Sequence, residues 1–114
     1  MVPFRERMDL HELAAERSIA FHRIIAKRLI QDPTILEKAR ERVRTWLAQN
    51  SERPFAREWE KILARDAESI AAFIVARSEL AEELRQSSPF AGALDPRERW
   101  RIWRRTREII LDEP

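Results

Sequence analysis

The sequence predicts an all-α fold, a single compact bundle of about four to six helices with short loops, and three observations support this prediction. Apolar residues make up 44% of the chain and recur at helical spacing throughout. Gly92 is the only glycine and no Asn-Gly pair is present, so the tight turns of a β-rich fold lack their usual residues. Acidic residues and prolines stand where helices would start. A chain of 114 residues has the length of one domain, so we expect residues 1–114 to share one core.

The first expected helix begins at Asp9, because Glu12 follows three residues later, as in a capping box. We expect residues 1–8 to be a poorly ordered lead-in. The helix ends at Asp32-Pro33, since the residue before a proline is pushed out of the helical region. The same dipeptide starts the second helix, with Asp32 as its cap. The apolar face of this helix is the most regular in the chain and consists of Leu36, Ala39, Val43, Trp46 and Leu47.

Three shorter helices are expected in the middle of the chain. The third helix starts near residues 51–54, and the pattern leaves open whether it continues through Asp66. Residues 67–76 are almost continuously apolar and predict the central buried helix. Ser78 is the expected cap of a further short helix, which ends near Gln86.

Residues 87–95 form the longest expected loop, in which turn-forming residues are mixed with the large apolar side chains of Phe90 and Leu94. We therefore expect this loop to lie across the core instead of extending into solvent. The last helix is expected over residues 96–111. Its start combines an aspartate cap, a proline at the first position and a capping glutamate three residues after the cap.

The composition excludes several classes of chemistry. The absence of cysteine removes disulfides, thiol catalysis and cysteine-bound metal. One glycine cannot build a phosphate-binding loop or a dinucleotide fingerprint, so we predict no cofactor and no small-molecule substrate. No apolar run approaches the roughly 20 residues of a membrane span, and the first residues lack the apolar core of a signal peptide. We therefore expect a cytoplasmic protein that does not engage a membrane.

The two histidines, His11 and His22, stand eleven residues apart in the sequence. This separation corresponds to about 16 Å along one helix, which is too far for both to bind one metal ion. A metal site would need carboxylates such as Glu12 or Glu16, or a second chain. We therefore predict no metal site and expect isolated histidines that are exposed or half-buried.

Arg17 and His22 together resemble the Arg-x4-His pattern of the HEPN ribonucleases, which are also helical. That resemblance implies a dimeric ribonuclease in which the arginine and histidine meet across the dimer cleft and the histidine helps to cleave RNA. On one regular helix the two side chains point well apart, so they would not converge within a single chain. We keep this activity as a second alternative.

The C-terminal helix has the most distinctive pattern in the chain. Between residues 96 and 111, six arginines against two acids give a charge of +4, whereas the whole chain carries +2 and its remainder therefore −2. The basic face consists of Arg97, Arg101, Arg104 and Arg105, and the apolar arc of Trp100, Ile102, Trp103, Ile109 and Ile110. We expect this arc to be broader than one neighbouring helix can cover.

These features predict a non-enzymatic module that binds another protein or a second copy of itself. Trp100 and Trp103 would anchor the contact, because tryptophan is strongly enriched at binding hot spots. Arg101, Arg104 and Arg105 would form its charged rim. The main alternative is nucleic-acid binding, in which the basic face follows a phosphate backbone. A purely structural interpretation, a core-packing helix with an arginine-rich outer face, also stays open.

Two segments resemble small bacterial all-helical proteins, some of which are linked to toxin–antitoxin-like gene pairs. The segments are residues 11–29, HELAAERSIAFHRIIAKRL, and residues 84–104, LRQSSPFAGALDPRERWRIWR. The likeness is stronger in the second segment, where a Ser-Pro-Phe-Ala-Gly loop precedes Pro-Arg-Glu-Arg-Trp. The resemblance implies a small binding protein, such as an antitoxin held against a toxin from the same operon, and it carries over no catalytic residue.

Overall fold

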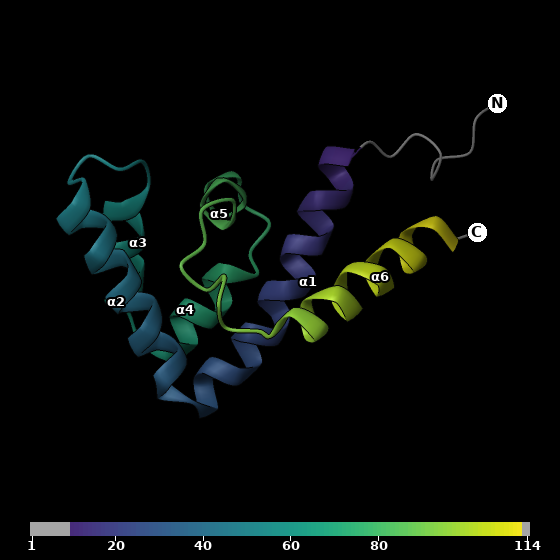
Figure 1. The fold of residues 1–114 in the computed structure, drawn as a ribbon, viewed down its shortest axis with the longest axis horizontal. Coiled ribbons are helices and arrows are strands. Elements are labelled where there is room, and N and C mark those ends of the chain that lie inside the picture. The colour runs from purple at the N-terminus through teal and green to yellow at the C-terminus, as the bar shows by residue number, and fades with distance from the viewer. Residues whose placement is uncertain (1–9, 113–114) are drawn as a thin grey trace.

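The computed structural model describes residues 10–112, with side chains from Glu12 to Arg107. Within this range the chain forms six helices and no strand, which confirms the predicted all-α fold (Figure 1). The predicted cap Asp9 and the predicted lead-in 1–8 lie outside the described residues. The helices are α1 (Leu10–Gln31), α2 (Pro33–Gln49), α3 (Ala56–Leu63), α4 (Ala67–Ile74), α5 (Glu79–Arg85) and α6 (Pro96–Asp112). No helix in the described part of the chain is long and apolar enough to cross a membrane.

The helices α1 and α2 meet at Asp32 and open into a V (Figure 1). The Asp32 backbone is extended, and its Oδ1 accepts a hydrogen bond from the backbone N–H of Thr34 at 3.0 Å. Pro33 fills the first helical position, where its missing N–H is not needed. The predicted boundary at Asp32-Pro33 is therefore confirmed.

The start of α3 differs from the prediction. The helix begins at Ala56, after the predicted 51–54, because Phe55 adopts a left-handed conformation with φ of 65°. Non-glycine residues rarely occupy this region, and no helix can pass through it. At its other end α3 stops at Leu63. Asp66 instead caps α4, where its Oδ1 accepts a hydrogen bond from Ser69 N–H at 2.8 Å.

The central helix, α4, lies between α1 and α2 and packs most extensively on α1 (Figure 1). It ends at Ile74, two residues before the predicted end. Arg85 explains the early stop, because its Nη1 donates hydrogen bonds to the carbonyls of Ile74 and Ala76. A guanidinium thus satisfies carbonyl groups that the end of a helix leaves unpaired. The expected cap at Ser78 is confirmed, since its Oγ accepts a hydrogen bond from Ala81 N–H at 3.2 Å.

The core is built around Trp59, which is fully buried. Its ring makes edge-to-face contacts with Phe73 and Phe90, and its Nε1 donates to the carbonyl of Leu84 at 3.2 Å. Because Phe90 and Leu94 are both buried, the 87–95 segment does lie across the core, as predicted. The main apolar cluster consists of Ile25, Leu29, Leu36, Ala39, Val43, Trp59, Ile62, Leu63, Ile70, Ala71, Ile74, Leu84, Phe90 and Leu94.

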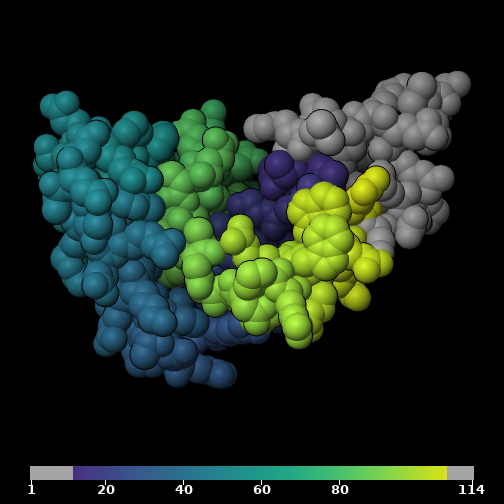
Figure 2. Space-filling view, viewed as in Figure 1, coloured from purple at the N-terminus to yellow at the C-terminus, as the bar shows by residue number. Residues whose placement is uncertain are grey.

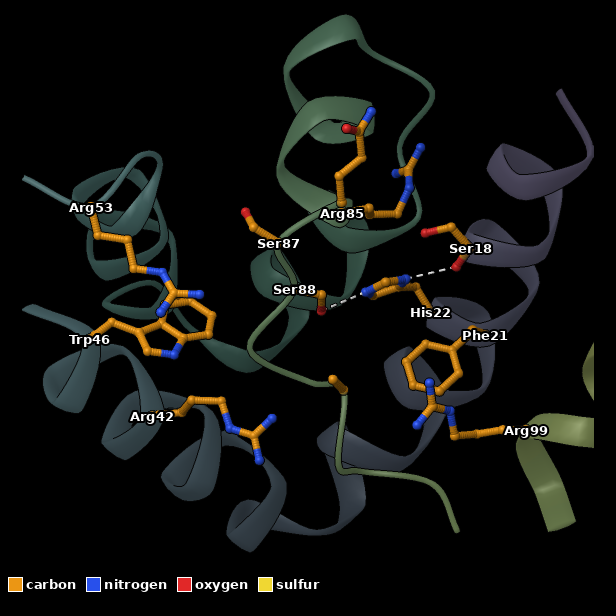
Figure 3. A pocket seen from close by; sticks show the side chains of 12 residues that line it. Ser18, Phe21, His22, Arg42, Trp46, Arg53, Arg85, Ser87, Ser88 and Arg99 are labelled. Atoms are coloured by element: carbon orange, nitrogen blue, oxygen red, sulfur yellow. Dashed lines mark hydrogen bonds between the residues drawn. The ribbon is translucent and has the colours of Figure 1, made fainter. Parts of the chain in front are cut away.

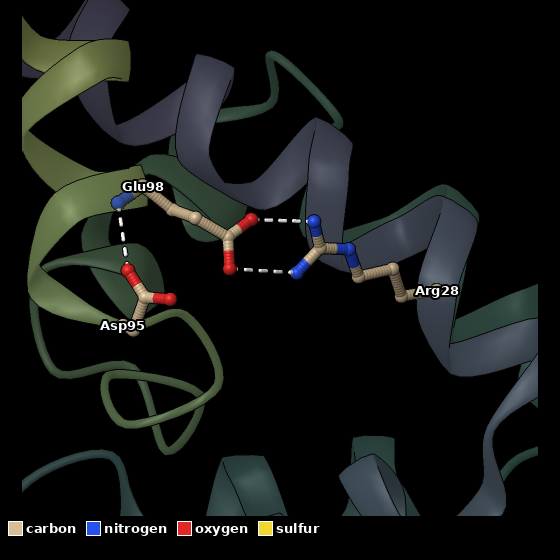
Figure 4. A network of polar contacts seen from close by, with 3 residues as sticks. All are labelled: Arg28, Asp95 and Glu98. Carbon is tan, nitrogen blue, oxygen red and sulfur yellow. Dashed lines mark hydrogen bonds and ion pairs between the residues drawn. The ribbon is translucent and has the colours of Figure 1, made fainter.

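The last helix, α6, packs chiefly on α1 (Figure 1). Asp95 caps it as predicted, with Oδ1 accepting from Glu98 N–H at 2.9 Å. The Glu98 carboxylate, which we predicted to complete the cap, instead forms a two-point ion pair with Arg28 of α1 (Figure 4). A guanidinium donates two parallel, charged hydrogen bonds to a carboxylate, and this interaction is stronger than the single hydrogen bond that a backbone N–H would donate. This ion pair fixes the first turn of α6 against α1.

Candidate functional site

The side of α6 that faces α1 carries a stack of aromatic and cationic groups. The rings of Trp100 and Trp103 lie nearly parallel, with their centroids 5.1 Å apart and their planes at 10°. The Arg17 guanidinium of α1 lies 3.7 Å from the centre of the Trp103 ring. Trp103 is half-buried by these contacts, but Trp100 at the edge of the stack remains 56% exposed. A large rigid ring is therefore presented to solvent on a supported surface.

A groove of about 530 Å³ runs between α1 and α6 next to this stack. We call it the α1–α6 groove. It is lined by Ala14, Arg17, Ser18, Phe21, Pro96, Arg99, Trp100, Ile102 and Trp103. Among the described residues the lining is mainly apolar, its only charged members are Arg17 and Arg99, and it contains no carboxylate.

The structure separates the residues that the sequence grouped on α6. Trp100 and Trp103 line the α1–α6 groove. The predicted basic face is exposed but lies outside the lining: Arg97, Arg101, Arg104 and Arg105. Arg99 was missed, although its spacing of four residues from Trp103 places it on the same side of the helix. Arg17 was considered only as a catalytic candidate, because nothing in the sequence shows that α1 and α6 are neighbours.

Arg17 and His22 do not come together. Arg17 packs on Trp103, whereas His22 points into the core and is only 2% exposed. The expectation of an exposed or half-buried His22 is therefore wrong, because residues 87–90 cover this side of α1 (Figure 3). A ribonuclease histidine must be reached by its substrate. The burial of His22 counts against the HEPN-like alternative.

Both ring nitrogens of His22 have partners (Figure 3). Its Nδ1 lies 2.7 Å from the carbonyl oxygen of Ser18, which can only accept, so Nδ1 carries the proton. In the neutral ring Nε2 is then an acceptor and accepts a hydrogen bond from the hydroxyl of Ser88 at 2.8 Å. Burial lowers the pKa of His22 to about 4, although the hydrogen bond to Ser18 acts in the opposite direction.

A second cavity of about 540 Å³ lies between α1, α2 and the segment after α5 (Figure 3). We call it the arginine cleft. Its lining consists of Ser18, Phe21, His22, Arg42, Trp46, Arg53, Arg85, Gln86, Ser87, Ser88, Ala91 and Arg99. In the space-filling view, the surface is hollowed between α6 and the segment after α5, with α1 as the floor (Figure 2). The cleft and the α1–α6 groove adjoin, because Ser18, Phe21 and Arg99 line both.

The four arginines of the cleft come from different parts of the chain. Arg53 lies over the ring of Trp46 at 4.0 Å, and Arg99 lies 5.8 Å from the ring centre of Phe21. Arg85 is only 5% exposed, and burial lowers the pKa of its guanidinium. Its Nη1 donates to the carbonyls of Ile74 and Ala76 at the end of α4, but its Nε and Nη2 have no hydrogen-bond partner.

Arg42 reaches the cleft across Gly92. A Cβ built on Gly92 would lie 3.1 Å from Nη2 of Arg42, which is closer than side chains normally approach. The backbone of Gly92 does not have the positive φ that favours glycine. A side chain at position 92 would therefore require the end of the Arg42 side chain to shift slightly.

No known protein family matches this chain, and neither a curated protein nor a solved structure shows significant similarity to it. Among the described residues, no group of three or more His, Cys, Asp or Glu is placed to hold a metal ion. The case for a function therefore rests on the α1–α6 groove and the arginine cleft.

Proposed function

We propose that this protein binds another protein through the α1–α6 groove, and that the partner presents an apolar side chain flanked by acidic residues. The observation that carries the proposal is the 56% exposure of Trp100 on a ring stack that is already held in place. Tryptophan offers a large contact area and loses little side-chain entropy on binding, because it has only two rotatable bonds. A supported, exposed tryptophan beside a groove is the arrangement typical of a binding hot spot.

Charge determines the chemistry of the partner. The charged residues that line the groove, Arg17 and Arg99, are both cationic. The basic face of α6 continues this positive surface beyond the groove. Acidic residues on a partner would be attracted to this surface and would orient the contact.

The same charge argues against a second copy of this chain as the partner. A symmetric dimer centred on Trp100 would bring the basic face of α6 close to its own copy. Like charges brought together across an interface cost free energy. We therefore favour a different, acidic protein, which agrees with the operon-partner role implied by the resemblance to toxin–antitoxin-like proteins.

The test uses a displayed library of random peptides, selected for binding to the full-length protein and then measured on variants. We expect the enriched peptides to share an aromatic or aliphatic residue flanked by Asp or Glu. Their affinity should fall about 30-fold or more for Trp100→Ala, as for a hot-spot residue. Leu80→Ala is the matched control, because Leu80 is a comparably exposed apolar residue on α5, at 48%, outside the groove.

Three outcomes would overturn the proposal. Enriched peptides without acidic residues would contradict the charge argument. Equal affinity for the Trp100→Ala and Leu80→Ala variants would place binding elsewhere. A dimeric mass in solution that Trp100→Ala converts to a monomer would identify a second copy as the occupant. Binding of a single-stranded oligonucleotide that weakens steeply with salt would instead favour the nucleic-acid alternative.

A further inference from the structure

The described lining of the arginine cleft contains four arginines and no carboxylate. The four are Arg42, Arg53, Arg85 and Arg99. Among the described residues, none of these four guanidinium groups takes part in an ion pair, since the two pairs present are Arg28–Glu98 and Arg77–Glu16. Four like charges around one cavity repel one another unless an anion lies between them.

Arg85 is the strongest indication that the cleft is built for a ligand. Its guanidinium lies on the side of Ser18, at one end of the cleft (Figure 3). At 5% exposure, its Nε and Nη2 can obtain few hydrogen bonds from solvent, and no protein group accepts from them. A buried donor without an acceptor is costly, so such groups in native proteins usually mark a bound partner or a functional role.

The nearest acids do not provide that acceptor. Glu16 and Glu82 attract Arg85 electrostatically, but neither forms a hydrogen bond with it. The Glu16 carboxylate is instead bound at both oxygens by Arg77. Glu82 is exposed and lines a neighbouring cavity, which Arg85 also lines. Among the described residues, no group therefore accepts a hydrogen bond from Nε or Nη2 of Arg85.

We propose that the arginine cleft is a binding site for a small molecule that carries two or more phosphate groups. Guanidinium groups match phosphate oxygens in two-point geometry, and several arginines around one cavity favour a multiply charged anion over a single carboxylate. The hydroxyls of Ser18 and Ser87 and the amide of Gln86 are further polar groups in the lining.

Size and depth favour a small molecule over a nucleic-acid strand. The cavity of about 540 Å³ lies within the usual range of small-molecule sites. A phosphodiester inside a strand is flanked by sugars on both sides, so it cannot reach a guanidinium that is only 5% exposed. A terminal phosphate or pyrophosphate group is free on one side and is therefore less hindered at such a depth.

The experiment is an isothermal titration of the full-length protein with pyrophosphate at low salt, repeated with inorganic phosphate and with a 5′-hydroxyl oligothymidine. We expect saturable pyrophosphate binding, weaker phosphate binding and no oligonucleotide competition. Arg42→Gln and Arg99→Gln should each lower the pyrophosphate affinity about tenfold, because each removes a charged hydrogen-bond donor. Both side chains are exposed, so neither variant is expected to unfold.

Arg44→Gln is the matched control, because Arg44 is exposed on α2, lies outside the cleft lining and removes the same charge. An equal loss of affinity in Arg44→Gln would show that only net charge matters and would overturn the proposal. Absence of pyrophosphate binding, or tighter binding of the oligonucleotide, would also overturn it.

Trp100→Ala should keep pyrophosphate binding intact, because Trp100 does not line the cleft. A failure of the proposed protein-binding role would therefore be recognised separately from a failure of the cleft proposal.

Discussion

The hydroxyl of Ser88 lies 2.8 Å from Nε2 of His22, and this contact joins α1 to the segment between α5 and α6 (Figure 3). The same oxygen accepts the backbone N–H of Phe90 at 3.1 Å. With the Ser18 carbonyl on the other ring nitrogen, a continuous chain of hydrogen bonds crosses the edge of the core. Such a chain satisfies every partner only while His22 is neutral.

Stability should therefore depend on the protonation of His22. Its pKa is about 4 in the folded protein, against 6.5 for the free side chain, so between these values the unfolded chain binds the proton more readily. The stabilisation is complete above pH 6.5 and is lost as the pH falls towards 4, with a magnitude on the order of 3 kcal/mol. Urea unfolding at pH 7.0 and at pH 4.5 measures this loss.

A His22→Phe variant is the control for this pH dependence, because it removes only this titrating group. The difference in unfolding free energy between the two pH values should be clearly smaller in the variant. If wild type and variant lose the same free energy between pH 7.0 and 4.5, other groups are responsible. The lowered pKa values of Glu16 and Glu98 give a stabilisation that is lost mainly below their ordinary value of 4.5, so they contribute little to the loss at pH 4.5.

Removal of the Ser88 hydroxyl should destabilise the fold. Ser88→Ala leaves both the Nε2 of His22 and the N–H of Phe90 without their partner, and an unsatisfied buried polar group costs about 1–3 kcal/mol. Ser87→Ala is the control, because the Ser87 hydroxyl makes only a long hydrogen bond of 3.4 Å to the carbonyl of Leu84. Chemical denaturation should separate the two variants, and equal midpoints would refute the role assigned to Ser88.

Trp59 and Trp100 should respond differently to the same substitution. Trp59→Phe removes a fully buried ring and its hydrogen bond to Leu84, so we expect a loss of about 2–4 kcal/mol. Trp100→Phe should change the unfolding free energy by less than about 0.5 kcal/mol, because Trp100 is 56% exposed. Thermal or urea unfolding of both variants tests this contrast, and a large loss in Trp100→Phe would mean that this ring belongs to the core.

Gly92→Ala should keep or raise the stability. The backbone at Gly92 is compatible with alanine, and such a substitution gains about 0.4–1 kcal/mol by restricting the unfolded chain. The added Cβ would meet only the far end of the Arg42 side chain, at 3.1 Å, which can move aside. A melting experiment checks this expectation. A clear fall in melting temperature would show that Arg42 is held rigidly in its place.

Local signals in the sequence were enough to place most helix boundaries. Asp32-Pro33, Ser78 and Asp95 each satisfy backbone N–H groups within a few residues, so their effect can be predicted without knowledge of the fold. The start of α3 could not be predicted this way. The left-handed conformation of Phe55 has no sequence signature, since such a conformation favours glycine.

The residues of the candidate sites were much harder to predict from the sequence than the helix boundaries. Trp100 and Trp103 were found because they are neighbours on one helix, but the groove also needs Arg17 from a helix about 80 residues earlier. The arginine cleft is lined by residues from α1, α2, α5 and α6. The sequence pattern of one helix cannot predict which residues of other helices lie next to it. Nothing in the sequence distinguishes Arg85 from the other arginines, because its burial and its unpaired nitrogens depend on the tertiary structure.

The peripheral position of α6 has a consequence for how the molecule opens. None of its described side chains is fully buried, and its packing depends chiefly on α1. Opening α6 alone should therefore require less free energy than unfolding α4, whose Ile70 and Ile74 are completely enclosed. Native-state hydrogen exchange would then separate the chain into a slowly exchanging body and a rapidly exchanging C-terminal helix, so the surface with Trp100 could detach while the remainder stays folded.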